Sequence, residues 1–234
     1  MSTISEMGDS MPTGTVVFDL DGTLADTSGD LLAAANVALN QLGHDVRLER
    51  GLDDQVALRG GKAMLRRAFE KSGFPGAEAE IEVGYPLVLA AYAEALDAHT
   101  TLYPGAISAV LTLQRAGFAT SICTNKPAAL AEDLLSRLGV RQHFAALIGA
   151  DTLTTRKPDP APYIAAVERS GGMLAQSLLV GDTDTDRKTA AAAGVPCILV
   201  DFSQSDVASL RPDAMISHFD ELKAQVLRLL RPSD

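Results

Sequence analysis

The sequence predicts an α/β protein: a doubly wound, Rossmann-like parallel sheet with an inserted all-helical domain. In residues 14–27 and 99–234, short apolar runs alternate with helical patterns, and parallel strands need such helical crossovers to connect them. Residues 28–98 break this alternation, because they show helical patterns and no convincing strand. A chain of 234 residues is long enough for one core domain and a smaller insertion.

The strands and helices of the core follow from the periodicity of the apolar residues. Strands are expected over residues 15–18, 119–123, 145–148, 177–180, 196–200 and 214–216, where apolar runs end at turn or charged residues. Helices are expected over residues 107–116, 127–138, 160–170, 184–193 and 220–230, where apolar residues recur at three- and four-residue spacing. Asp159 is expected to cap the helix that starts at Pro160.

The insertion, residues 28–98, is expected to contain helices over residues 31–42, 62–71 and 77–96. Turn-forming residues flank it and predict flexible connections to the core: Asp26, Thr27, Ser28 and Gly29 on one side, Thr100, Thr101 and Pro104 on the other. We therefore interpret residues 28–98 as a separate domain and residues 14–27 and 99–234 as the core.

Composition limits the partners and the compartment. Thirty acidic against twenty basic residues give a net charge of −10, which repels the phosphate backbone of nucleic acids. The two cysteines cannot form a disulfide framework, and no apolar run approaches the roughly 18 residues of a membrane span. Residues 1–13 lack the basic start of a secretion signal and predict a flexible leader. We expect a reduced, cytoplasmic protein that binds neither nucleic acid nor membrane, as a monomer or homodimer.

Polar residues gather where the predicted strands end, which is where doubly wound sheets bind their ligands. In chain order they are Asp19 and Asp21, Thr124 and Asn125, Lys157, and Asp182 with Asp186. Carboxylates suit Mg²⁺, and a lysine completes an anion site. Each residue alone has an ordinary explanation as a turn former, helix cap or solvated charge, but together they form the set that phosphoryl transfer needs.

Four motifs resemble those of the haloacid dehalogenase superfamily of phosphohydrolases. The run Asp19-Leu20-Asp21-Gly22-Thr23 is similar to its first motif, DxDGT. The stretches 121–126, 156–160 and 180–186, read as SICTNK, RKPDP and VGDTDTD, resemble the second, third and fourth motifs. The resemblance covers the chain after the leader, in the right order, and the helical insertion lies where some members carry a small cap domain.

The resemblance implies a role for each motif residue. Asp19 would be the nucleophile that takes the phosphoryl group, and Asp21 would protonate the leaving oxygen and then deprotonate water. Mg²⁺ would be held by Asp19, the backbone carbonyl of Asp21 and Asp182, with Asp186 acting directly or through water. Thr124 and the amide of Asn125 would bind phosphate oxygens, while Lys157 offsets the negative charge.

Within the superfamily, Asp21 disfavours dehalogenation, since the dehalogenases lack an acidic residue at this position. The chain resembles the phosphoglycolate phosphatases in its DGT continuation and in a glycine-rich turn, residues 58–62, that opens a helix of the insertion. Arg59 and Lys62 at this turn could pair with a substrate carboxylate, or they could be solvated charges at a helix start.

The sequence therefore predicts a Mg²⁺-dependent phosphatase for a small phosphorylated metabolite. One alternative is a sugar-phosphate mutase of the same superfamily, although Thr23 favours hydrolysis because the mutases often carry another residue there. A second alternative is a regulatory or binding module with a phosphorylatable aspartate. Such modules are shorter and have no helical insertion after the first strand, which argues against it.

Overall fold

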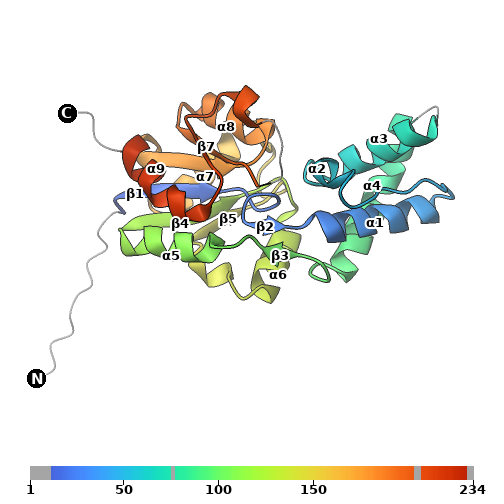
Figure 1. Ribbon diagram of the computed structural model, residues 1–234, viewed down its shortest axis with the longest axis horizontal. Coiled ribbons are helices and arrows are strands. Elements are labelled where there is room, and N and C mark those ends of the chain that lie inside the picture. Colours follow the sequence, from blue (N-terminus) through green and yellow to red (C-terminus); the bar gives the residue numbers. More distant parts are fainter. Residues whose placement is uncertain (1–11, 75–76, 203–206, 231–234) are drawn as a thin grey trace, which may run out of the picture.

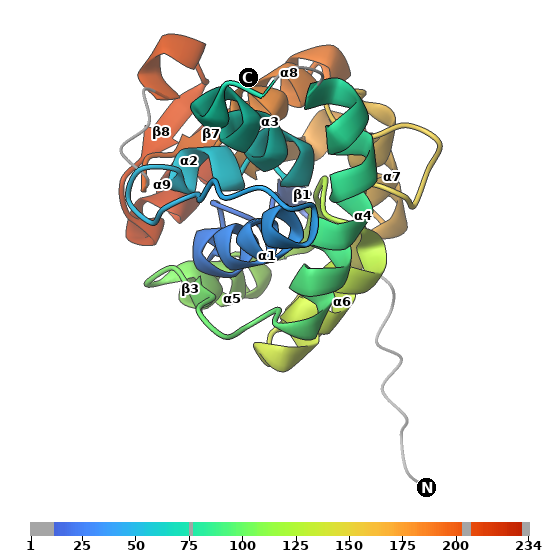
Figure 2. The same cartoon turned by 90° about the vertical axis from the view of Figure 1, so that its right-hand side faces the viewer.

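The computed structural model describes residues 12–74, 77–202 and 207–230. Residues 1–11 of the expected leader lie outside these ranges, and Thr13 donates a backbone hydrogen bond to the carbonyl of Gly117. The sheet and its helices form one part of the molecule, and a group of helices stands at one end of it (Figure 1). Figure 2 looks onto this helical group, which covers that end of the sheet.

The core is a six-stranded sheet in the order β5-β4-β1-β6-β7-β8, and every pair in it is parallel. Its strands are β1 (Gly14–Phe18), β4 (Phe118–Cys123), β5 (Ala146–Ile148), β6 (Ser177–Gly181), β7 (Cys197–Val200) and β8 (Ala214–Ile216). The predicted doubly wound parallel sheet is confirmed, with strand ends within one residue of those expected.

Helices cover both faces of this sheet because its strands are apolar on both sides. The core helices are α5 (Ala106–Arg115), α6 (Ala128–Arg137), α7 (Ala161–Arg169), α8 (Asp184–Ala193) and α9 (Leu222–Leu229). Val16 and Phe18 of β1 share an apolar cluster with residues of α5, α6 and α9, whereas Val17 belongs to the cluster of α7 and α8. The alternation along β1 thus buries one residue on each face in turn.

The bounds of α5, α6 and α7 differ by one residue at each end from those expected, and α9 begins two residues later than expected. Helix α7 begins at Ala161, so that Pro160 takes the capping position, while Asp159 Oδ1 still accepts the backbone N–H of Ala161 at 2.8 Å. Helix α9 begins at Leu222 because a short 3₁₀ turn, Phe219–Glu221, precedes it. Further 3₁₀ turns are Arg141–His143, Leu174–Gln176 and Val207–Leu210. Single 3₁₀ turns are too short to leave a clear periodic pattern in the sequence.

The helices at the end of the sheet are α1 (Ser28–Gln41), α2 (Asp54–Ala57), α3 (Gly61–Ser72) and α4 (Ala77–Glu94). We call residues 28–98 the cap. Apolar residues of α1, α3 and α4 bury one another, among them Leu39, Leu65 and Ile81, none of which is exposed. The one-turn helix α2 was not expected, because four residues are too few to show a helical period.

The two connections between cap and core are ordered by hydrogen bonds, which differs from the expected flexible loops. Strand β2 (Ala25–Asp26) pairs in antiparallel fashion with β3 (Thr101–Leu102). The buried carboxylate of Asp30 accepts the backbone N–H groups of His99 and Thr100 and the Thr100 hydroxyl, at 2.7–3.0 Å. A short ladder and one buried acceptor therefore join the two ends of the cap.

Both cysteines, Cys123 and Cys197, are free and buried. Over the three described ranges, every helix is too short or too polar to cross a lipid bilayer.

Candidate active site

The loop that follows β1 brings two aspartates to the carboxyl end of the sheet. Asp19 is held there by a backbone hydrogen bond from its N–H to Val180 of β6 and by its own Oδ1, which accepts the N–H of Leu20 at 2.7 Å. The chain then turns at Gly22, where φ is +78° and a Cβ atom would lie 2.3 Å from Oδ2 of Asp182. Glycine is needed at this position both for the backbone angle and for the close approach of Asp182.

A capping box at the start of α8 fixes the second acidic pair. Thr183 is the N-cap residue, and Asp186 occupies the third helical position. Oδ2 of Asp186 accepts hydrogen bonds from the backbone N–H and the hydroxyl of Thr183, at 3.1 and 2.7 Å. The same Oδ2 accepts the N–H of Asp182 at 3.3 Å. These bonds orient the Asp186 carboxylate toward the centre of the site and hold Asp182 at the end of β6.

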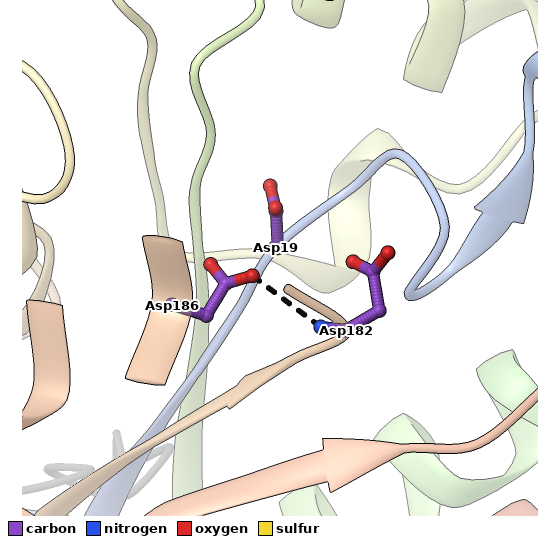
Figure 3. A group of neighbouring side chains, drawn as sticks. All are labelled: Asp19, Asp182 and Asp186. Carbon is purple, nitrogen blue, oxygen red and sulfur yellow. Dashed lines mark hydrogen bonds between the residues drawn. The ribbon is translucent and has the colours of Figure 1, made fainter. Parts of the chain in front are cut away.

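Asp19, Asp182 and Asp186 together form a compact cluster of buried carboxylates (Figure 3), in which one oxygen of each lies within 4.8 Å of the others. Burial raises the pKa of Asp19 to about 6; Lys157 opposes this shift, and the nearby carboxylates of Asp186 and Asp21 add to it. Burial also raises the pKa of Asp182, and the charges of Asp186 and Asp19 raise it further. The cluster therefore carries more negative charge than its surroundings compensate.

Lys157 is the internal cation of this cluster. Its buried ammonium lies 2.9 Å from Oδ2 of Asp19 and 2.6 Å from Oδ1 of Asp186. Burial alone would lower the pKa of Lys157, but the two carboxylates outweigh burial, so that the net shift is upward and the side chain stays charged. The side-chain amide of Asn125 donates to the carbonyl of Lys157 at 3.0 Å and so fixes the loop that carries the lysine.

The donor set fits a hard divalent cation such as Mg²⁺. Its donor atoms are carboxylate oxygens, which Mg²⁺ prefers, and the pKa values of Asp19 and Asp182 are raised first by burial and further by the neighbouring carboxylates, a repulsion that a cation would relieve. Asp186 already bonds Lys157 through Oδ1 and three donors through Oδ2. We therefore expect Asp19 and Asp182 to bind the metal directly and Asp186 to act through water.

The second motif ends β4 beside this cluster. The backbone N–H of Thr124 donates to Ile148 of β5, and its Oγ1 accepts the N–H of Lys126 at 3.2 Å. Thr124, Asn125 and Lys157 line the same cavity as Asp19 and Asp21. The structure thus brings all the core residues singled out in the sequence to one edge of the sheet.

The cavity has a volume of about 770 Å³ and lies between the core motifs and the cap. Arg59 and Lys62, the cap residues singled out in the sequence, both line it. Lys62 is already paired with Glu82, at 2.5 Å, whereas the structure shows no ion pair for Arg59 with any residue of the described ranges. Arg59 is therefore the better placed of the two for a ligand anion.

Several residues of the site were given no role from the sequence. Thr23 Oγ1 donates to Oδ1 of Asp182 at 2.8 Å, and Thr27 Oγ1 donates to Oδ1 of Asp21 at 2.6 Å. Lys126 forms an ion pair with Asp21 at 2.8 Å. Thr23 lies in the first motif and Lys126 in the second, so their positions in the sequence already indicate that they lie near the site. Thr27 lies beyond the first motif, and only the turn at Gly22 brings it back to Asp21.

The raised carboxyl pKa values predict an unusual pH dependence of stability in chelator. Burial raises the pKa of Asp19 from 3.8, its value in an unfolded chain, to about 6, so the folded state binds more protons between these values and stability increases as the pH falls. From pH 7.5 to 5 we expect Asp19 alone to add about 1 kcal/mol, or roughly 2–4 °C in Tm. Thermal unfolding in EDTA at several pH values measures this increase in Tm. Asp19→Asn should remove the part of the increase that Asp19 contributes. A Tm that falls steadily over this range in wild type would contradict the prediction.

Comparison with known proteins identifies the family of the chain. A family model of haloacid dehalogenase-like hydrolases matches residues 16–200. A phosphoglycolate phosphatase of Mesorhizobium japonicum is 39% identical over 219 residues, 92% of this chain and 96% of its own, and one of Agrobacterium fabrum is 36% identical over 88% of this chain and 89% of its own.

Solved structures show the same fold. A protein of Haemophilus somnus, described as a predicted phosphoglycolate phosphatase, has a TM-score of 0.78 at 24% identity, over 92% of this chain and 99% of its own. A haloacid dehalogenase-superfamily hydrolase of Geobacter sulfurreducens has a TM-score of 0.68 at 24% identity, over 92% of this chain and 97% of its own. The chain therefore belongs to the haloacid dehalogenase-like hydrolase family and, within it, to the phosphatases, enzymes that hydrolyse phosphoric monoesters.

Proposed function

We propose that the chain is a Mg²⁺-dependent phosphatase that hydrolyses a small phosphorylated metabolite of the phosphoglycolate kind through a phospho-aspartate at Asp19. The observation that carries this proposal is the buried cluster of Asp19, Asp182, Asp186 and Lys157, with Asp21 lining the same cavity. A nucleophilic carboxylate, a cation beside it and a second carboxyl group for protons are what phosphoryl transfer through an enzyme carboxylate needs.

In the first half of the reaction, a carboxylate oxygen of Asp19 attacks phosphorus and the bond from phosphorus to the ester oxygen breaks. Asp21 donates a proton to that leaving oxygen, so the product departs as a neutral alcohol. Thr124 and the N–H of Asn125 hold phosphate oxygens. Mg²⁺, when bound, supplies positive charge that offsets the carboxylates and the phosphoryl oxygens.

In the second half, Asp21 takes a proton from a water molecule, which attacks phosphorus and breaks the bond to Asp19. Inorganic phosphate leaves and both aspartates return to their starting state. Lys157 stays charged in both halves because the Asp186 carboxylate holds it even while Asp19 carries the phosphoryl group, and it opposes the repulsion between the incoming phosphate and the acidic cluster.

The relatives named phosphoglycolate phosphatase support a substrate with a phosphate at one end and a carboxylate at the other. Arg59 of the cap is the residue that we expect to bind the substrate carboxylate, because it lines the cavity. Lys62 lines the cavity too, but it already forms an ion pair with Glu82. A guanidinium group binds a carboxylate through two parallel hydrogen bonds.

For Arg59→Ala we expect kcat/KM for phosphoglycolate to fall about 10- to 100-fold while that for p-nitrophenyl phosphate, which has no carboxylate, changes little. Steady-state kinetics with both esters measure the ratio. Arg66→Ala is the matched control, since Arg66 is an exposed arginine of the same cap that is paired with Glu78. Equal losses on the two esters would show that Arg59 does not bind the carboxylate.

The experiment that tests the proposed function is phosphate release from a panel of small phosphate esters, with Mg²⁺ and with chelator. We expect turnover that requires the metal and is fastest on a short carboxylate-bearing ester. Release without metal would contradict the metal requirement. Retention of phosphate in an isomeric product would favour the mutase, and a phospho-aspartate that lasts for hours without turnover would favour a regulatory module.

A further inference from the structure

Lys126, two residues beyond Thr124, is a buried cation that the reaction steps above do not use. Its side chain is only 4% exposed, and its ammonium group lies 2.8 Å from Oδ1 of Asp21. The same group donates a hydrogen bond to the hydroxyl of Tyr92 at 3.0 Å and lies 4.3 Å from the centre of the tyrosine ring. An ammonium group is buried at high cost unless it is paired, so these two partners fix its place.

The contacts of Asp21 leave one of its oxygens for the substrate. Oδ1 receives both Lys126 and the hydroxyl of Thr27, at 2.8 and 2.6 Å. Within the described ranges, the structure shows no hydrogen bond or ion pair to Oδ2, and Asp21 lines the cavity. Two donors on one oxygen restrict rotation of the carboxylate, which sets the direction of the other oxygen.

Tyr92 joins this arrangement to the cap. It lies in α4, near the end of the cap that leads back to the core, and only 1% of it is exposed. Burial raises the pKa of its hydroxyl to about 12, so the phenol stays neutral and accepts the lysine N–H. Lys126 therefore bridges a cap helix and the Asp21 carboxylate.

We propose that Lys126 is a positioning residue, which fixes the Asp21 carboxylate for proton transfer and couples that position to the cap through Tyr92. The proposal rests on the proposed function, since it requires Asp21 to protonate the leaving oxygen. A displaced cap would move Tyr92, and with it one of the two partners that hold the Lys126 ammonium group beside Asp21.

The test compares an alkyl ester with an aryl ester. An alkoxide needs the proton of Asp21 to leave, whereas p-nitrophenolate leaves without one. The ratio of kcat/KM for ethyl phosphate to kcat/KM for p-nitrophenyl phosphate thus reports how well Asp21 is placed, because neither ester has a carboxylate for Arg59 and kcat/KM covers the step in which the ester bond breaks. A purely structural role for Lys126 would lower both values equally.

We expect Asp21→Asn to lower the ratio by about 10²- to 10³-fold, Lys126→Met by about tenfold and Tyr92→Phe by about threefold. Lys188→Met, on an exposed lysine of α8, is the matched control and should leave the ratio unchanged. The double variant of Lys126→Met and Tyr92→Phe should match Lys126→Met alone, because Tyr92 acts through the lysine. Circular dichroism and Tm check that each variant is folded.

A Lys126→Met ratio within twofold of wild type, alongside a lowered ratio for Asp21→Asn, would overturn the positioning proposal and leave the proposed function intact. If Lys126→Met does not fold, Tyr92→Phe keeps the aromatic ring and decides the question: an unchanged ratio overturns the proposal. If wild type releases no phosphate, the proposed function itself fails; if wild type is active but Asp21→Asn leaves the ratio unchanged, the proton-transfer role of Asp21 fails and the positioning proposal with it.

Discussion

Asp19→Asn is expected to lower kcat by about 10⁴-fold or more on every phosphate ester, the largest effect of any single substitution in this chain. An amide has nearly the size of the carboxylate but cannot attack phosphorus as a charged nucleophile. The substitution also removes one charge from the crowded cluster of Asp19, Asp182 and Asp186, so the folded protein should become more stable in chelator at pH 7.5.

Steady-state phosphate release and thermal unfolding measure the two effects together. A lower kcat together with a higher Tm separates loss of chemistry from loss of fold, because a variant that is inactive through unfolding cannot also have a higher Tm. Asp133→Asn is the matched control: it neutralises a half-exposed surface carboxylate paired with Arg137 and should leave kcat unchanged. An Asp19→Asn protein with more than a tenth of wild-type turnover would exclude the phospho-Asp19 route.

Lys157→Met is expected to have the second largest effect, a fall in kcat of about 10²- to 10³-fold together with a loss of stability. Met fills nearly the same volume but leaves Asp186, which is not exposed at all, without its buried cation. Removing one partner of a buried ion pair typically costs about 3–5 kcal/mol. Lys157→Met should therefore lower the stability of the folded protein, whereas Asp19→Asn should raise it, because Lys157→Met increases the uncompensated negative charge of the cluster.

Urea unfolding in chelator and steady-state kinetics with Mg²⁺ check this prediction. The conservative variant Lys157→Arg should recover most of the stability and part of the activity, since it restores the charge in a larger group. If Lys157→Met were as stable and as active as wild type, the lysine would not compensate the acidic cluster.

The sequence predicts much of this fold because the strands of the parallel sheet are buried on both faces. Continuous apolar runs such as Leu178–Val180 are therefore easily recognised, and their ends fall at the polar motifs. Helix α8 has the bounds expected from its apolar spacing, and the capping box of Thr183 and Asp186 fixes its start. The residues of the core site follow the ends of these strands, so the sequence also predicts that they lie close together.

The remaining features depend on contacts between segments far apart in the chain. The ladder of β2 and β3 contains only two residues on each strand, too few for a period, and its partners come from opposite ends of the cap. Tyr92 lies in a helix rich in apolar residues, where nothing distinguishes it from a core tyrosine until the cap meets Lys126. Arg59 and Lys62 look alike in the sequence, and only the structure shows that Glu82 pairs with Lys62.

The β2–β3 ladder also bears on how the cap and its specificity can change. Because Ala25 pairs with Leu102, the chain leaves and re-enters the core at one point, and the roughly 75 residues between behave as a loop whose ends are already joined. Closing a loop of that length costs about 4 kcal/mol in chain entropy, and the cost grows only with the logarithm of the length. Insertions or exchanges within the cap therefore add little to the free energy of folding the sheet, so the segment that contacts the substrate can diverge in length and sequence while the strand order of the core stays the same.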